Sequence, residues 1–290
     1  MWRPGLARTS HRHPAVMYGW CVDFDLEKYF DRVNHDKLMG AVAKRVGDKR
    51  LLKLIRAFWN AGVMEDGLVN VYLHYVFDLW VEVWREKVAR GDMIAVRYAD
   101  DLVVGFEHRA EAERFLEEFR KRLAKFGLEV HPEKTRLIEF GRFAQVNRKR
   151  RGAGKPETFA FLGFTHYCGT SPKGHFVVGR RTVAKRMRAK LLSLKQELRR
   201  KMHEPVGVVG GWLKRAVEGY YRYHAVPGNI VVLRRFRDRL CMLWRQALRR
   251  RSQRRRPGWD RLRPTFERWI PRPRTLHPYP DVRFDATHPR

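Results

Sequence analysis

The stretch Met93–Phe106, MIAVRYADDLVVGF, decides the fold, because two apolar runs, Met93–Val96 and Leu102–Phe106, flank the adjacent acids Asp100 and Asp101. Two such runs around a polar turn predict a β-hairpin that carries both carboxylates at its turn. Like charges about 4 Å apart repel by roughly 4 kcal/mol at a surface-like dielectric, so chains that hold them together usually supply a cation. A divalent metal ion is the natural one.

A second acidic stretch, Val22–Asp31, predicts a strand in which Asp23 and Asp25 share one face while Phe24 and Leu26 share the other. We expect Asp25 to meet the two hairpin acids across neighbouring strands. Three carboxylates around two Mg²⁺ ions about 4 Å apart would stabilise the attacking and leaving oxygens of a phosphoryl transfer. The pattern therefore predicts nucleotide addition.

Four ordered blocks resemble the palm motifs of bacterial group II intron reverse transcriptases, and the likeness runs from about Tyr18 over most of the chain. The blocks are Asp25–Asp36 (DLEKYFDRVNHD), Tyr98–Asp101 (YADD), Gly127–Thr135 (GLEVHPEKT) and Phe159–Phe164 (FAFLGF). The resemblance implies an α+β fold: a right-hand polymerase palm, with an antiparallel sheet backed by helices, followed by a helical thumb and maturase region. It implies these divisions: residues 1–17, a fingers remnant or disordered segment; 18–170, the reverse transcriptase palm; 171–205, the start of the thumb; 206–290, a maturase-specific RNA-binding region.

The resemblance also implies a metal site and a proton donor. Asp25 and Asp100 match the principal metal ligands, with Asp101 beside them and the main-chain carbonyl of Leu26 as a further ligand. The cofactor would be two Mg²⁺ ions, for which Mn²⁺ is a possible substitute. Lys134 matches the lysine proposed to protonate the departing pyrophosphate, a task that suits an ammonium group. The alternative for Lys134 is an ordinary surface lysine.

Two further roles concern the nucleotide and the primer. Phe30 matches the aromatic residue that crowds the 2′ position of the sugar and favours deoxynucleotides, although an isolated Phe would be assigned to the core. The residues Phe159, Phe161, Leu162 and Gly163 resemble the hairpin that grips the primer terminus, although an ordinary apolar hairpin has the same pattern.

Composition points to a polyanionic partner. The 290 residues include 62 Lys and Arg against 31 Asp and Glu, a formal net charge of +31. An excess of this size favours nucleic acid binding over mere solubility. The expected partners are an RNA template or intron RNA, a DNA primer and deoxynucleoside triphosphates.

The three cysteines are far apart in the sequence, which excludes a paired zinc-ligand spacing and fits a reduced compartment. No apolar run approaches the ~20 residues of a membrane span, and the N-terminus lacks the apolar centre of a signal peptide. We therefore expect a cytoplasmic protein without a membrane partner.

Apolar periodicity predicts helices, and a change of composition predicts a linker. The expected helices are residues 35–59, 69–88, 107–126 and 183–202, and the expected loop or linker is 142–156. In the second helix the buried candidates are Tyr72, Val76, Leu79 and Val83.

The C-terminal third interleaves aromatic residues with arginine and looks like the maturase-specific domain of the same family. Such mixtures suit base stacking and phosphate contacts with RNA. The alternative is a helical core of aromatics with a solvated arginine face. The expected RNA-binding residues are Arg249, Arg250, Arg251, Arg254, Arg255 and Arg256.

Two departures from the family pattern qualify the function. Only 24 residues precede Asp25, so most of the fingers are expected to be missing, and the Pro-Gln-Gly-Gly motif of relatives occurs nowhere. One functional class is an RNA-directed DNA polymerase. The second is a maturase-like RNA-binding protein, impaired in catalysis, whose palm serves as scaffold. A third, weaker alternative is a nuclease that uses the same acids.

Overall fold

The computed structural model describes residues 18–27, 35–44, 46–60, 70–171, 173–251 and 258–279. The chain divides into two compact units. Unit 1 consists of Met1–Leu162 and Tyr167–Val178, and unit 2 consists of Gly163–His166 and Gly179–Arg290. The fold is α+β, as the sequence predicted.

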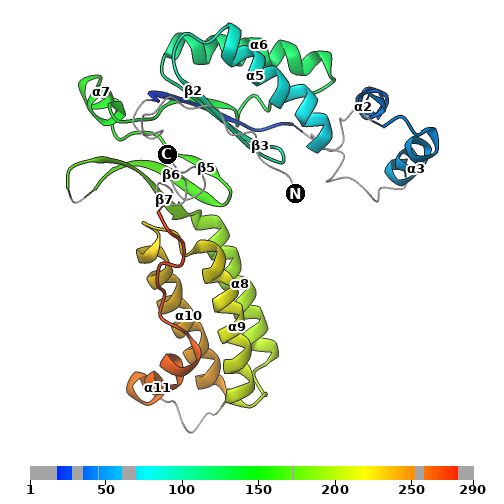
Figure 1. Ribbon diagram of the computed structural model, residues 1–290. Helices are drawn as coiled ribbons and strands as arrows, with labels where there is room; N and C mark the ends of the chain where they lie inside the picture. Colours follow the sequence, from blue (N-terminus) through cyan, green and yellow to red (C-terminus); the bar gives the residue numbers. More distant parts are fainter. Residues whose placement is uncertain are drawn as a thin grey trace. The chain divides into compact units, whose positions relative to one another are not determined.

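Unit 1 is organised around a four-stranded antiparallel sheet of order β2-β3-β1-β4 (Figure 1). Its strands are β1 (Trp20–Phe24), β2 (Met93–Tyr98), β3 (Asp101–Phe106) and β4 (Arg136–Glu139). The β2–β3 pair is the hairpin predicted from the opening stretch, and its register ends with Tyr98 opposite Asp101. In and just after β1, Phe24 and Leu26 are buried while Asp23 and Asp25 are partly exposed, so the predicted alternation is confirmed.

Two helical segments cover one face of this sheet (Figure 1). They are α6 (Arg109–Lys125) and the segment that joins the π-helix η1 (His74–Asp78) to α5 (Leu79–Lys87). Their shared core is aromatic: Phe119 meets Phe24 edge-to-face with ring centroids 5.2 Å apart, and Phe115 meets Trp84 at 5.0 Å. Such pairs stabilise a core by about 1 kcal/mol beyond the area they bury.

Two of the four residues predicted to be buried in the 69–88 helix are exposed. Tyr72 and Val76 are buried as expected, but Leu79 and Val83 are 43% and 48% exposed. The cause is η1, because a π turn holds one more residue than an α turn and so rotates the following side chains by about 100°. After it, the core side of α5 carries Val81 and Trp84 instead.

The π turn is stabilised by an arginine from α6. Arg122 donates hydrogen bonds to the carbonyls of Tyr75 and Val76, which lie inside η1. Its guanidinium also lies over the Phe126 ring, 5.1 Å from the centroid. A π turn leaves some backbone carbonyls without good hydrogen bonds inside the helix. Arg122 supplies the missing donors to two of them.

The predicted 35–59 helix is two helices, α2 (His35–Ala43) and α3 (Lys49–Asn60). Asp48 begins the second, since its Oδ1 accepts hydrogen bonds from the backbone N–H groups of Arg50 (2.8 Å) and Leu51 (3.3 Å). This side-chain cap satisfies donors that a continuous helix would have used internally.

The predicted 142–156 linker contains a short helix, α7 (Ala144–Arg150). Glu139, buried at the end of β4, accepts a hydrogen bond from Asn147 at 2.9 Å and forms an ion pair with Arg151. A tertiary contact from outside the segment, rather than apolar periodicity within it, therefore holds this segment in place.

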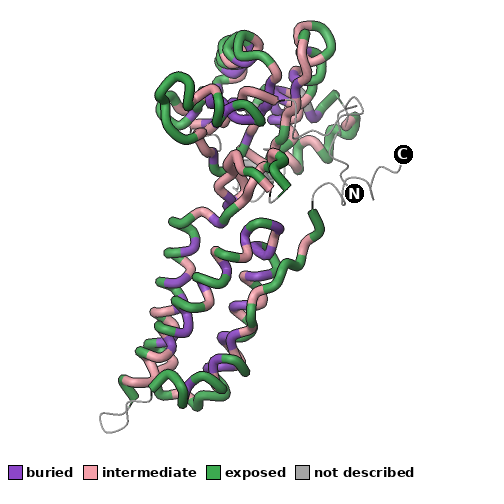
Figure 2. Tube along the Cα trace, turned by 90° about the vertical axis from the view of Figure 1, so that its left-hand side faces the viewer, coloured by how far each residue is buried: buried purple, intermediate pink, exposed green. Residues whose placement is uncertain are grey.

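Unit 2 is mainly helical, with α8 (Ala184–Arg200), α9 (Val206–His224), α10 (Ile230–Arg250) and α11 (Trp259–Trp269). The predicted 183–202 helix is confirmed, and the four apolar residues expected on its inner side are all buried: Met187, Leu191, Leu194 and Leu198. Figure 2 shows buried stretches recurring along these helices. A second sheet, of order β5-β6-β7, has strands β5 (Phe159–Phe161), β6 (Phe164–Thr170) and β7 (Phe176–Thr182) and contributes residues to both units.

Several aromatics of the C-terminal third belong to the core of unit 2. Tyr221, Phe236 and Trp244 are buried, and Tyr220 stacks on Phe236 with centroids 4.2 Å apart. For these residues the core interpretation holds, while Tyr223 is 51% exposed. None of the helices in the described ranges is long and apolar enough to cross a membrane.

Candidate active site

The paired acids begin at a tight turn between β2 and β3. Ala99 and Asp100 form the two-residue connection, and Asp101 is the first residue of β3. Ala99 has φ of 54°, in the left-handed region that costs an L-residue roughly 1–2 kcal/mol. The turn therefore stores backbone strain directly beside the two carboxylates.

Arg97 ties this strained turn to the helical layer. Its guanidinium donates to both carboxylate oxygens of Asp78, at 2.7 and 2.6 Å, and its side chain is only 6% exposed. The same group donates to Asn70 Oδ1 at 3.0 Å and to the Ala99 carbonyl at 3.4 Å. A bidentate, nearly buried pair of this kind fixes geometry as well as charge, so η1 and the acidic turn are held together.

The predicted meeting of Asp25 with the hairpin acids has a structural basis in strand register. The last β1–β3 pair is Phe24 opposite Leu102, so the next residues of the two antiparallel strands are Asp25 and Asp101. Both acids therefore lie at the same end of adjacent strands, next to the turn that carries Asp100.

The segment that follows α6 holds the backbone and the charge of Asp25. The Asp25 carbonyl accepts a hydrogen bond from the His131 N–H at 2.7 Å, and its N–H donates to Thr135 Oγ1 at 3.3 Å. Lys134 from the same segment places its Nζ 3.5 Å from Asp25 Oδ2. Two predicted site residues from different blocks are thus brought together.

Asp23 is a member of this acidic group to which sequence reasoning gave no role. Burial raises its pKa to about 6, although a hydrogen bond and the positive charge of Arg136 oppose the shift. The charges of Asp101 and Asp25 raise it further, so the three acids share one electrostatic environment. The Arg136 guanidinium lies 3.3 Å from the Asp23 carboxylate.

The donor chemistry at this end of the sheet suits a divalent cation, because Mg²⁺ prefers carboxylate oxygens. Across the parts of the chain that the structure describes, however, no three His, Cys, Asp or Glu side chains are grouped to hold a metal ion. The Asp25 carboxylate faces the Lys134 ammonium instead.

Two residues with predicted roles at the nucleotide are Phe30, expected to contact the sugar, and Leu26, whose main-chain carbonyl is expected to bind the metal ion beside it. Phe30 lies outside the described residues. Leu26 is buried and forms a β-bridge with Val130, which ties the end of the first strand to the segment that carries Lys134.

The predicted primer-gripping residues form the start of the second sheet. Phe159 is buried and packs against Phe140 with ring centroids 5.0 Å apart. Leu162 and Gly163, with φ of 48° and 77°, form the two-residue turn between β5 and β6. Positive φ at both positions is the requirement of a type I′ hairpin turn.

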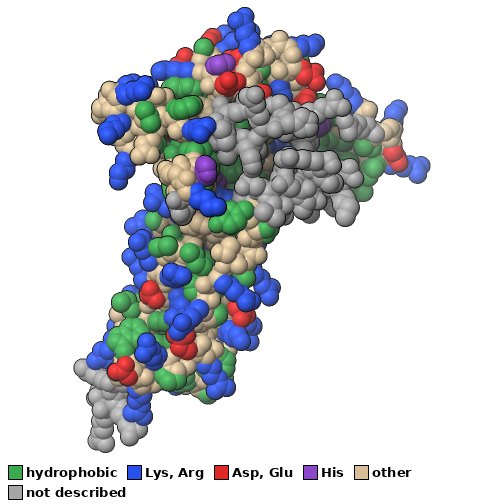
Figure 3. Space-filling view, turned by 60° about the vertical axis from the view of Figure 1, so that its left-hand side comes forward, with side chains coloured by type: hydrophobic (Ala, Val, Ile, Leu, Met, Phe, Trp, Pro, Cys, Tyr) green, Lys and Arg blue, Asp and Glu red, His purple; other side chains and the backbone are tan. Residues whose placement is uncertain are grey.

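The predicted RNA-binding arginines lie at the end of α10. Arg249 and Arg250 are in its last turn, and the Arg251 guanidinium donates to the Glu204 carbonyl at 2.8 Å. The other three, Arg254, Arg255 and Arg256, fall outside the described residues. Figure 3 shows many Lys and Arg side chains on the visible surface.

A sequence model described as reverse transcriptase (RNA-dependent DNA polymerase) matches residues 4–166, more than half of the chain. The chain belongs to the reverse transcriptase family. The match includes the β1 and β2–β3 acids and the Lys134 segment, so the site lies within the part of the chain that carries the family's signature. Members of this family generally use divalent metal ions.

Two curated proteins are similar to parts of the chain. Protein YkfC of Escherichia coli is 27% identical over 165 residues, which cover 41% of this chain and 43% of that protein. The "Uncharacterized 91 kDa protein in cob intron" of Schizosaccharomyces pombe is 29% identical over 73 residues, 19% of this chain and 9% of that protein. The chain therefore spans less than half the length of either relative.

Among solved structures, apo telomerase from Candida tropicalis covers 93% of this chain and 45% of its own, with 12% sequence identity and a TM-score of 0.44. A likeness at this level adds nothing to the family assignment, which rests on the sequence match.

Proposed function

We propose that this reverse transcriptase domain acts as an RNA-directed DNA polymerase of the group II intron type, by two-metal nucleotidyl transfer. The observation that carries the proposal is the position of Asp25 and Asp101 at one end of adjacent strands, with the Lys134 ammonium 3.5 Å from Asp25. Carboxylates and an ammonium at one place are the groups that phosphoryl transfer needs for cation binding and for protonation of a leaving group.

In this proposal Asp25, Asp100 and Asp101 would hold Mg²⁺, or Mn²⁺ in its place. Bound ions would stabilise the charge that develops on the attacking and leaving oxygens. The chain itself contributes position: the Arg97–Asp78 pair holds the acidic turn, and His131 with Thr135 holds the Asp25 backbone. Lys134 would deliver a proton to the departing pyrophosphate.

The proposed partners are an RNA template or intron RNA, a DNA primer and deoxynucleoside triphosphates. We assign the palm to residues 18–170, the start of the thumb to 171–205 and an RNA-binding maturase region to 206–290. The primer terminus is assigned to the β5–β6 turn, and RNA to the arginines at the end of α10. The net charge of +31 supports a nucleic acid partner.

Primer extension on an RNA template tests the polymerase proposal. Asp100→Asn and Asp101→Asn are each expected to lower the extension rate by about a hundredfold or more, because each removes a charge that positions a catalytic ion. Glu113→Gln, which removes an exposed carboxylate on α6, is the matched control and should extend normally. Equal extension by the wild type and both Asp variants would remove the polymerase proposal.

A maturase-like RNA-binding protein without polymerase activity is the second candidate. It is favoured by the lack of a three-ligand group among the described side chains and by the large basic excess. We expect the pair Arg249→Gln and Arg250→Gln to weaken binding to structured RNA and to reduce the slope of log affinity against log salt by about one for each phosphate that the variant no longer neutralises. The pair Arg114→Gln and Arg120→Gln on α6 removes the same charge from unit 1. Equal weakening by both pairs would contradict an RNA site on α10.

A further inference from the structure

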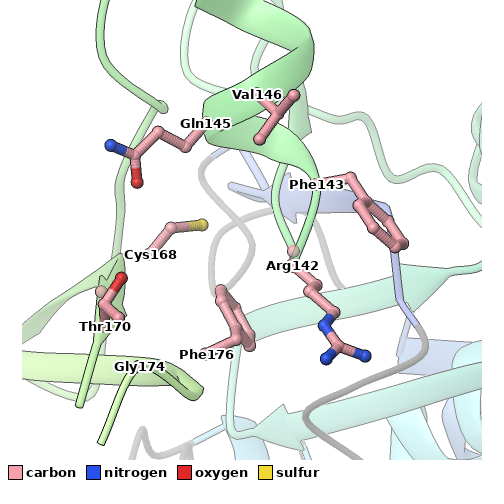
Figure 4. Close-up of a pocket in the computed structure, with 10 residues that line it drawn as sticks. Arg142, Phe143, Gln145, Val146, Cys168, Thr170, Gly174 and Phe176 are labelled. Atoms are coloured by element: carbon pink, nitrogen blue, oxygen red, sulfur yellow. The ribbon is translucent and has the colours of Figure 1, made fainter. Parts of the chain in front are cut away.

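Unit 1 contains a pocket of about 300 Å³ that lies outside the acidic site. Two segments line it: the connection from β4 into α7, and the β6–β7 hairpin (Figure 4). The side chains that matter for its chemistry are Arg142, Phe143, Gln145, Cys168, Thr170 and Phe176. Its volume is at the lower end of the range for small-ligand sites, which suits one flat group rather than a larger cofactor.

The lining combines the three kinds of group that recognise an unpaired nucleotide. Phe143, which is 64% exposed, and Phe176 offer aromatic faces. Gln145 and Thr170 offer neutral hydrogen-bond donors and acceptors, and Arg142 offers a positive charge. Bases stack on aromatic rings, their edges bond to amides and hydroxyls, and guanidinium groups bind phosphate.

The two segments that line the pocket also carry exposed cations. Lys149 and Arg150 are exposed in the last turn of α7, and Lys173 is exposed in the β6–β7 turn. No acidic side chain is among the described residues that line the pocket. Glu139, whose charge acts on Cys168, is itself paired with Arg151, so the net charge of these segments favours an anionic chain over a neutral small molecule.

The pocket wall formed by α7 is held without a ligand. Glu139 binds Asn147 and Arg151, and Arg148 donates to the carbonyls of Ala153 (2.9 Å) and Lys155 (3.0 Å). These contacts fix the segment that a sequence pattern would leave as a linker. A site that is already formed avoids the entropy cost of ordering a loop on binding.

We propose that this pocket takes one unpaired nucleotide of a single-stranded nucleic acid, with the base against the Phe143 ring and a phosphate at Arg142. The site uses none of the acids or the lysine of the proposed polymerase centre. It therefore stands whether or not the chain polymerises, and its test needs neither Mg²⁺ nor nucleotides.

Cys168 provides the readout. It lines the pocket and is half-buried, whereas the other two cysteines, Cys21 and Cys241, are buried. Burial raises the pKa of the Cys168 thiol, so labelling is slow and must be compared at one fixed pH. We expect a short oligouridine, added without Mg²⁺, to slow maleimide labelling of Cys168, with Cys168→Ala identifying the labelled position.

Substitutions of pocket residues test whether the protection of Cys168 comes from binding in this pocket. Phe143→Ala is expected to raise by about tenfold the oligouridine concentration needed for protection, because stacking on one aromatic ring is lost. Arg142→Gln should act in the same direction. Val83→Ala and Arg120→Gln, at exposed positions on α5 and α6, are the matched controls. In both, oligouridine should protect Cys168 at the same concentration as in the wild type. Oligouridine should also protect Cys168 fully in the Asp101→Asn variant. This result would separate the pocket from the proposed polymerase centre.

Three results would overturn the proposal. The first is unchanged Cys168 labelling when anisotropy shows that the oligouridine is bound. The second is full protection in the Phe143→Ala variant at wild-type concentrations. The third is equal protection by a duplex of the same length, since paired bases are not available to stack in a pocket.

Discussion

At the scale of single residues, Asp23 shows that burial can outweigh an ion pair. Arg136 lies 3.3 Å away and favours the ionised carboxylate, yet desolvation and the neighbouring acids raise the Asp23 pKa to about 6. A carboxyl whose pKa is higher in the folded state binds more protons there than in the unfolded state between pH about 4 and 6. The free energy of unfolding therefore falls as the pH rises through this window.

Asp23→Asn should remove that penalty. We expect the variant to be more stable than the wild type by about 2 kcal/mol near pH 8, where Asp23 is ionised, and equally stable near pH 4. Urea unfolding at the two pH values measures this difference. A variant that is destabilised near pH 8 would mean that the Arg136 contact outweighs burial.

Strand alternation led us to expect Asp25 near the hairpin acids, and the family resemblance named Lys134; the structure places Asp25 beside Asp101 in register and 3.5 Å from Lys134. Sequence reasoning did not find the role of Asp23, whose pKa depends on a partner 113 residues away, or of Thr135, which bonds the Asp25 backbone. These effects arise from burial and cross-strand neighbours, which no local pattern encodes. The metal-ligand role of the acids stays a prediction.

At the scale of elements, the Arg97–Asp78 pair joins η1 to the acidic turn. Asp78→Asn removes the bidentate carboxylate that the nearly buried Arg97 guanidinium binds, and breaking such a pair typically costs about 3 kcal/mol or more. We expect a loss of stability of this size in denaturant unfolding, together with slower primer extension because the turn that carries Asp100 loses an anchor.

The control for this prediction is Glu117→Gln, which breaks the exposed Lys121–Glu117 pair on α6. Exposed pairs contribute about 1 kcal/mol or less, so this variant should unfold almost like the wild type. Equal effects of the two substitutions would show that the Arg97–Asp78 pair is no more than a surface contact.

The elements that sequence predicted correctly are those with an uninterrupted pattern, such as α8 with its four inward residues and the β2–β3 hairpin. The errors occur where one local feature changes the pattern. The π turn moved Leu79 and Val83 to the surface, and the Asp48 cap divided the 35–59 helix in two. In α7 the stabilising partner, Glu139, lies outside the segment altogether.

At the scale of the whole molecule, the two units carry titrating groups of opposite effect. His166 and His224, both in unit 2, have pKa values lowered to about 4, first by burial and then by the charges of Arg180 and Arg186 respectively. The unfolded chain binds these protons between pH about 6.5 and 4 while the folded chain does not. Unit 2 therefore loses stability as the pH falls, in the same range in which protonation of Asp23 favours unit 1.

Calorimetry near pH 7 and near pH 5 should therefore show the unit 2 transition moving to lower temperature. His224→Gln removes one of the two groups and should reduce this shift, whereas His175→Gln, at an exposed position, should leave it unchanged. A unit 2 transition that does not move with pH would contradict the assignment of His166 and His224 as neutral in the folded protein.

The division of the chain between its units has a practical consequence for anyone who dissects this protein by truncation. The boundary is crossed three times, at Leu162, His166 and Val178, so no single cut yields two intact modules. A fragment that starts at Gly179 would lack Phe164, whose ring stacks on Tyr223 at 5.7 Å and meets His224 at 5.4 Å. A fragment that starts at Gly163 keeps both parts of unit 2 and carries residues 167–178 of unit 1 with them, so a truncation or gene fusion that is meant to preserve the helical half should begin there.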